Sequence, residues 1–84
     1  MNTKDLALYQ FDYCPYCVRV RRVIEGLGIK IEIRDTMRDP SHKQDLLEGG
    51  GMTQVPCLRI ETENGVEWMY ESSDIIQYLE TRFG

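Results

Sequence analysis

The chain lacks several features that would assign it at once to a broad class. Its 84 residues contain no apolar stretch near the ~20 residues of a membrane span, and its polar first five residues do not resemble a signal peptide. Three cysteines are an odd number, which argues against the disulfide framework of a small secreted protein. A net charge of −4 argues against general nucleic-acid binding. We therefore expect a cytoplasmic protein with neither a membrane nor a nucleic-acid partner.

The composition is that of an ordinary globular protein. Apolar residues make up 42% of the chain and charged residues 29%. A chain of this length has room for one hydrophobic core. We expect residues 1–84 to form a single domain and to act as a monomer.

The most informative feature is a pair of cysteines three residues apart, in Cys14-Pro15-Tyr16-Cys17. The apolar residues that follow have the spacing of a buried helical face: Val20, Val23, Ile24 and Leu27. Proline is well suited to the first turn of a helix. We therefore expect Cys14 at the N-terminus of a helix, where free N–H groups and the helix dipole stabilise an ionised sulfur that is accessible to solvent. Cys17 follows one turn later, as a resolving thiol would.

Two structural interpretations of the cysteine pair remain open. Zinc sites often contain such a pair but need two further ligands, and only Cys57 and His42 are candidates. His42 has no partner pattern, and we expect it on the surface. A structural disulfide would close a very short loop, which removes only about 2 kcal/mol of chain entropy from the unfolded state. Redox chemistry is the interpretation that the pattern favours.

The remaining pattern predicts four strands and three helices. Residues Ile29, Ile31 and Ile33 alternate with charged residues, which indicates a strand with one buried face. Asn64-Gly65 is a hairpin signal. The Ser72-Ser73-Asp74 segment offers capping side chains for a last helix. The expected elements are strands at 6–11, 29–34, 55–60 and 65–70, and helices from residue 15 to about 27, from 40 to about 49, and from about 72 onward. This order, βαβ followed by α and ββα, predicts an α/β fold in which helices flank a four-stranded mixed sheet.

Three arginines, Arg19, Arg21 and Arg22, follow the cysteine pair. They are consistent with an ordinary solvated helix face. They are also consistent with a local positive field that supports a thiolate and attracts an anionic substrate.

With these residues in view, the chain resembles the glutaredoxins, enzymes of the thioredoxin-like fold that use glutathione. The resemblance spans essentially the whole sequence. It rests on the cysteine tetrapeptide after a strand, on Val55-Pro56 before the third strand, and on Ser72-Ser73-Asp74 at the last helix. The segment Glu71-Ser72 and the following Ile75–Leu79 also resemble the N-terminal, glutathione-binding domain of glutathione transferases.

The resemblance implies a thiol–disulfide oxidoreductase that reduces disulfides or glutathione mixed disulfides. Cys14 would be the nucleophile and Cys17 the resolving thiol. Pro56 would be cis, which leaves the backbone of Val55 free to pair with the glutathione peptide. The N–H groups at the start of the last helix would bind a carboxylate. Glutathione is the implied co-substrate, no metal is expected, and the implied substrate-binding residues are Tyr16, Val55, Pro56, Glu71, Ser72 and Ser73.

The chain departs from the glutaredoxin pattern before its first cysteine. Many members carry a lysine there, whereas this stretch is Gln10-Phe11-Asp12-Tyr13. Asp12 adds negative charge, so a thiolate at Cys14 is less favoured than usual unless Arg19 or Arg22 compensates. The helical second domain of the transferases has no counterpart in the sequence, so we expect no hydrophobic-substrate site of their kind.

Two other functions fit the same residues. One is a transferase-like module that binds glutathione without turnover. The other is a carrier of an iron–sulfur cluster or zinc, held by Cys14 with glutathione or by Cys14, Cys17 and Cys57.

Overall fold

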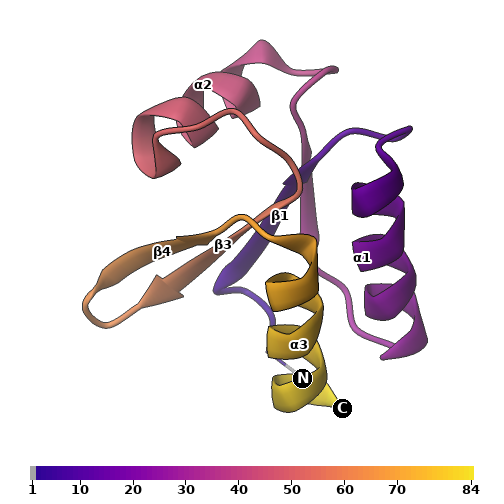
Figure 1. The fold of residues 1–84 in the computed structure, drawn as a ribbon. Coiled ribbons are helices and arrows are strands. Elements are labelled where there is room, and N and C mark those ends of the chain that lie inside the picture. The colour runs from indigo at the N-terminus through magenta and orange to yellow at the C-terminus, as the bar shows by residue number, and fades with distance from the viewer. Residues whose placement is uncertain (1) are drawn as a thin grey trace.

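A four-stranded mixed sheet forms the centre of the protein. The computed structural model describes residues 2–84. The strands are β1 (Leu6–Gln10), β2 (Glu32–Asp35), β3 (Cys57–Thr62) and β4 (Gly65–Met69), and the helices are α1 (Pro15–Gly26), α2 (Pro40–Gly50) and α3 (Ser72–Phe83). The strand order is β2-β1-β3-β4. β1 runs parallel to β2 and antiparallel to β3, which pairs antiparallel with β4 (Figure 1).

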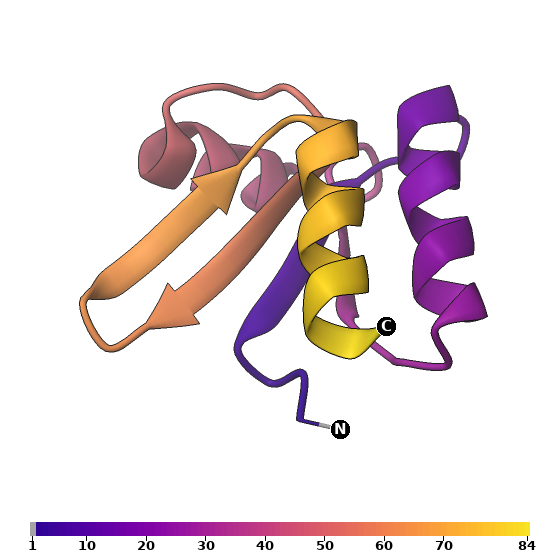
Figure 2. The ribbon, with the colours of Figure 1, turned by 60° about the horizontal axis from the view of Figure 1, so that its bottom comes forward.

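Helices cover both faces of this sheet. α1 and α3 run side by side on one face, with their N-termini at the same end, and α2 lies on the other face (Figure 2). β1 lies inside the sheet, and all five of its residues are buried. Leu6 and Leu8 contribute to the core beneath α1 and α3, whereas Tyr9 belongs to a second cluster beneath α2. Because successive side chains of β1 point to opposite faces of the sheet, this one strand contributes to both hydrophobic clusters.

The main core joins apolar residues of α1 and α3 with apolar residues of the sheet. Val20 and Ile24 of α1 and Ile75 and Leu79 of α3 pack on the sheet residues Leu6, Leu8, Leu58 and Ile60. The smaller cluster under α2 contains Tyr9, Leu46 and Cys57, with Trp68 and Tyr70 against it. This arrangement, a βαβ unit followed by α2 and ββα, is the thioredoxin-like fold that the sequence indicates.

All four strands differ from their predicted bounds, and β1 ends at Gln10 rather than at Phe11. β2 begins at Glu32, so Ile29 and Ile31 are buried in the connection before it and Ile33 is 44% exposed. The expectation of a single buried face through Ile33 is therefore wrong, because β2 is an edge strand and Ile33 lies at the margin of the sheet. β3 begins at Cys57 rather than at Val55, and β4 ends at Met69 rather than at Tyr70.

The helix boundaries agree more closely. α2 starts at Pro40 and ends against Gly51, whose φ of 89° is the left-handed conformation that glycine adopts readily. The N-cap of α3 is Glu71, and its side chain makes no capping hydrogen bond. The expected capping by the Ser72-Ser73-Asp74 side chains is thus wrong, because these residues already lie inside the first turn. Within residues 2–84, no helix has the length and apolarity needed to cross a membrane.

Candidate functional site

Cys14 is the N-cap residue of α1. Its backbone is extended, with φ −75° and ψ 119°, and Pro15 opens the helix. The backbone N–H of Cys17 donates to the Cys14 sulfur over 3.4 Å. The sulfur therefore occupies the position of a capping side-chain oxygen, next to the free N–H groups and the positive end of the helix dipole. The sequence predicts this placement of Cys14 at the N-terminus of a helix.

Cys14 is more enclosed than the sequence suggests. Only 6% of the residue is exposed, so the expectation of a freely accessible sulfur is wrong. A turn closes the chain around it, because the Cys14 N–H donates to the Phe11 carbonyl over 3.3 Å. The rings of Tyr13 and Tyr16, on either side in the sequence, are largely exposed.

Cys17 is fully buried one turn into the helix. Burial, and next the hydrogen bond with Cys14, raise the pKa of Cys17 to about 12, while the charge of Arg21 acts in the opposite direction. Cys17 therefore keeps its proton at neutral pH. The two thiols are chemically different although they lie side by side.

A cavity of about 200 Å³ gathers most of the predicted substrate-binding residues. Tyr16, which lies between the two cysteines in the sequence, lines it, whereas neither Cys14 nor Cys17 does. It is lined by Tyr16, Gln54, Val55, Pro56, Tyr70, Glu71 and Ser72. Ser73 is exposed and does not line it. Three segments far apart in the sequence meet here: the first turn of α1, the loop before β3 and the start of α3. The structure thus brings five of the six predicted substrate-binding residues together around one cavity.

The loop before β3 places backbone groups at this cavity. The Val55-Pro56 peptide bond is cis, as the resemblance implies. β3 begins only at Cys57, and no backbone hydrogen bond joins Val55 to another residue of the described chain. The Tyr70 hydroxyl donates to the Met52 carbonyl over 3.0 Å and so ties this loop to the end of β4. The N–H and carbonyl of Val55 are therefore free to bind an extended peptide.

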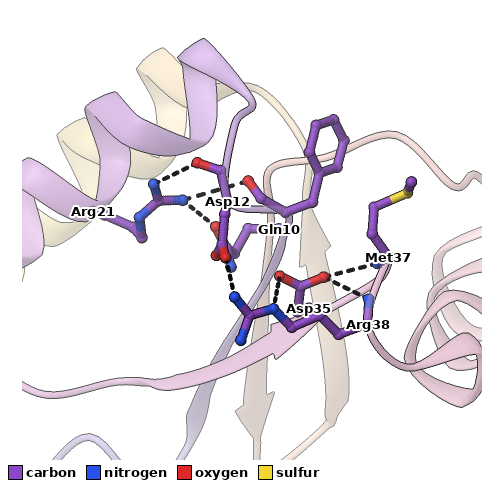
Figure 3. A network of polar contacts seen from close by, with 7 residues as sticks. Gln10, Asp12, Arg21, Asp35, Met37 and Arg38 are labelled. Carbon is purple, nitrogen blue, oxygen red and sulfur yellow. Dashed lines mark hydrogen bonds and ion pairs between the residues drawn. The ribbon is translucent and has the colours of Figure 1, made fainter.

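The charges before Cys14 are arranged differently from the expectation. Arg21, not Arg19 or Arg22, turns toward the segment that precedes the cysteine, and its guanidinium contacts Gln10, Phe11 and Asp12 (Figure 3). The carboxylate of Asp12 forms a 2.6 Å ion pair with Arg38. The negative charge that Asp12 adds is thus paired.

Sequence reasoning missed the roles of Gln10, Arg21 and Arg38. One signal was present for Arg21, since it follows Cys17 by four residues and so lies on the same side of the helix. Arg38 gave no such signal, because the loop that carries it is 26 residues from Asp12 in the sequence.

The other zinc candidates lie apart from the pair. Cys57 is buried at the start of β3, and burial raises its pKa to about 12. His42 is half-buried rather than on the surface, 3.7 Å from Asp39 and edge-on to the ring of Tyr9. Among the residues that the structure describes, no group of three or more His, Cys, Asp or Glu side chains is placed to hold a metal ion. A site formed by all three cysteines therefore has no geometric support.

A cysteine at the N-terminus of the first helix and a cis-proline before the third strand define a thioredoxin-like protein with a thiol site. Residues 8–84 match the family model described as the N-terminal domain of glutathione S-transferase. The chain belongs to this family.

Curated relatives carry glutaredoxin names. The chain is 29% identical over 75 residues to glutaredoxin 2 of Escherichia coli, which covers 89% of this chain and 33% of that protein. It is 37% identical over 63 residues to glutaredoxin-C2 of Arabidopsis thaliana, which covers 71% of this chain and 57% of that protein. The chain thus spans about a third and about half of the lengths of these relatives.

A solved structure relates the fold to a bound ligand. Maleylacetoacetate isomerase from Anaeromyxobacter dehalogenans, with glutathione in its active site, superimposes with a TM-score of 0.71 and 26% identity. The match covers 93% of this chain and 37% of that one.

Proposed function

We propose that the protein is a glutathione-dependent thiol–disulfide oxidoreductase, with Cys14 as nucleophile and Cys17 as resolving thiol. The observation that carries this proposal is the 3.4 Å contact between the Cys17 N–H and the Cys14 sulfur at the start of α1. It places the Cys14 sulfur against a helix N–H, whereas burial raises the pKa of Cys17 to about 12. The glutaredoxin names of the relatives support the same class of reaction.

The reaction starts when the Cys14 thiolate attacks one sulfur of a disulfide. A new S–S bond forms to Cys14, the old S–S bond breaks, and the leaving sulfur departs as a thiolate that takes up a proton. The negative charge on Cys14 disappears in this step. Because the contact with Cys14 is one cause of the raised pKa of Cys17, loss of that charge makes Cys17 easier to deprotonate.

The mixed disulfide is then resolved by one of two thiolates. Cys17 attacks the Cys14 sulfur, which forms the Cys14–Cys17 disulfide and releases the bound thiol. Alternatively, the thiolate of a second glutathione attacks the glutathione sulfur of the mixed disulfide, which returns Cys14 as a thiolate and releases glutathione disulfide. In the first route the two electrons come from Cys14 and Cys17, and two glutathione molecules then reduce the Cys14–Cys17 disulfide and leave as glutathione disulfide. In the second route the attacking glutathione supplies them directly.

The cavity that Tyr16, Val55 and Glu71 line would hold glutathione. Its peptide backbone would pair with the free backbone groups of Val55, next to Pro56, while the N–H groups at Ser72 and Ser73 would bind a carboxylate. Glu71 would accept from the ammonium group of the γ-glutamyl end. Of the residues that line the cavity, Tyr16 is the one closest to Cys14 in the sequence.

Substitution of each cysteine tests this function. With a peptide–glutathione mixed disulfide as substrate, we expect Cys14→Ser to abolish reduction and Cys17→Ser to retain part of it. Cys57→Ser is the matched control, since its thiol is buried in the cluster beneath α2, with Tyr9 and Leu46. Full activity of Cys14→Ser would overturn the assignment.

A second candidate is a transferase-like module that binds glutathione without reducing disulfides. The family match and the Glu71-Ser72 lining of the cavity favour it. Binding of glutathione to the wild type, measured by calorimetry, together with no turnover of the mixed disulfide, would support this candidate instead.

A further inference from the structure

Arg21 makes an unusual set of contacts with the chain just before Cys14. Its Nη1 donates to the side-chain oxygen of Gln10 and lies 3.5 Å from the Phe11 carbonyl, and its Nη2 donates to the Asp12 carbonyl over 2.9 Å (Figure 3). One guanidinium thus contacts three consecutive residues. Its planar fork of donors is suited to this task, whereas a lysine ammonium is a single point of charge.

These contacts lead directly to the reactive sulfur. The Phe11 carbonyl beside Arg21 also accepts the N–H of Cys14 over 3.3 Å. That hydrogen bond helps to fix the extended backbone of Cys14, which in turn places its sulfur against the Cys17 N–H. Arg21 and Cys17 both belong to α1. The helix therefore contacts the Cys14 sulfur through Cys17 and the preceding Phe11 carbonyl through Arg21.

The far end of the segment is anchored as well. Gln10 is buried, and its carbonyl accepts the Thr36 N–H over 2.9 Å, so the first residue that Arg21 contacts is fixed in the sheet. The Asp12 side chain is held by Arg38, whose own N–H donates to the Asp35 carboxylate over 2.8 Å. The turn before Cys14 is therefore held between α1 and the loop after β2 (Figure 3).

We propose that Arg21 is a positioning residue for Cys14: its guanidinium fixes the Gln10–Asp12 backbone and thereby holds the Cys14 sulfur at the N-terminus of α1. This inference rests on the proposed role of Cys14 as nucleophile. It assigns this task to the geometry of the Arg21 guanidinium rather than to its charge alone.

The test compares Arg21→Lys, which keeps the positive charge, with the wild type. Cys14 of the reduced protein is alkylated with iodoacetamide from pH 4 to 10, and peptide mass spectrometry locates the label. We expect the midpoint of the pH–rate profile to rise by about one unit in Arg21→Lys, which lowers the rate about tenfold at pH 6. Arg21→Gln should behave similarly. Arg22→Lys, at an exposed neighbouring position, should match the wild type.

A second measurement reads the positioning itself. In folded Arg21→Lys, amide hydrogen exchange at Cys14 should accelerate, because its bond to the Phe11 carbonyl is loosened, while exchange at Ile24 in the middle of α1 stays unchanged. Equal acceleration at both amides would indicate general unfolding and overturn the proposal. It would likewise be overturned if Arg21→Lys kept the wild-type profile, or if Arg22→Lys lost as much.

The two proposals fail in different ways. If the wild-type Cys14 is no more reactive than a free cysteine at neutral pH, the proposed function and this inference both fail. If the wild-type Cys14 is reactive and the Arg21 variants are equally so, only the role of Arg21 is wrong.

Discussion

The carboxylate of Asp12 and the guanidinium of Arg38 form an ion pair 2.6 Å apart, two residues before the candidate nucleophile. The two side chains are 55% and 77% exposed, so the pair adds little to stability. It does matter for local charge. An unpaired carboxylate at this position would oppose a negative sulfur at Cys14.

Removal of Arg38 should therefore make Cys14 less reactive. We expect Arg38→Gln to slow alkylation of Cys14 at pH 6 by at most about fivefold, since an exposed charge contributes no more than about 1 kcal/mol. The double variant Asp12→Asn, Arg38→Gln should recover the wild-type rate. The difference should shrink at 1 M salt, where the screening length is about 3 Å. A double variant as slow as Arg38→Gln would show that Arg38 acts in some way other than neutralising Asp12.

The buried Cys57 thiol should weaken the protein at alkaline pH. Burial raises its pKa in the folded state to about 12, above the ~8.5 of an exposed cysteine. The unfolded chain therefore releases this proton first, so the contribution is fully present below about pH 8.5 and is lost as the pH rises toward 12. Within that window, each pH unit costs about 1.4 kcal/mol of unfolding free energy for one such thiol.

Cys57→Ala removes the pH-dependent contribution of the Cys57 thiol to the unfolding free energy. The unfolding free energy is measured with urea under a reducing agent at pH values from 7 to 11. Above pH 9 it should fall less steeply with pH in Cys57→Ala than in the wild type, by the slope that release of about one proton produces. Cys17 contributes a similar slope in both proteins and cancels in the comparison. Parallel curves for the two proteins would mean that the Cys57 thiol ionises equally easily in the folded and unfolded chains.

Gly49 allows α2 to approach the sheet closely. A Cβ at this position would lie 2.1 Å from Cζ2 of Trp68, and the ring is held in place by Tyr9, whose centroid is 5.5 Å away. Alanine is normally the better helix former by about 1 kcal/mol. The overlap should outweigh that gain, since overpacking costs about 1–3 kcal/mol.

We therefore expect Gly49→Ala to destabilise the protein by about 1 kcal/mol and to change the fluorescence of Trp68. Gly26→Ala is the matched control, because a Cβ at Gly26, the last residue of α1, meets nothing within 4 Å. That variant should be neutral or up to about 1 kcal/mol more stable. Equal unfolding midpoints for the two variants would refute the close-packing explanation.

Local signals explain why most of the fold could be predicted from the sequence. Pro15 and Pro40 mark the first turns of α1 and α2, and Gly51 stops α2 in a conformation that suits glycine. The cysteine pair carries its own geometry, because a three-residue spacing at a helix start places the Cys17 N–H beside the Cys14 sulfur. Each of these features depends on residues that are neighbours in the sequence.

What could not be predicted depends on contacts between distant residues. Ile33 fits a buried strand by its pattern but lies at the margin of the sheet, so it is exposed. From the sequence alone, the charge of Asp12 disfavours a thiolate at Cys14. The fold pairs this carboxylate with Arg38, which is distant in the sequence. Arg19, Arg21 and Arg22 have the same chemistry, and spacing from Cys17 is the one sequence signal for Arg21. Its contacts with Gln10 and Asp12 follow from the placement of α1 beside the end of β1.

The most direct test of the account is to ask which sulfur takes up glutathione. Reduced Cys17→Ser protein, kept native, is treated with glutathione disulfide, and peptide mass spectrometry locates the adduct. We predict one glutathione per chain, on Cys14, formed faster than on a free cysteine peptide at pH 7. An adduct on Cys57, or a Cys14 that stays unmodified until the chain is unfolded, would contradict the account.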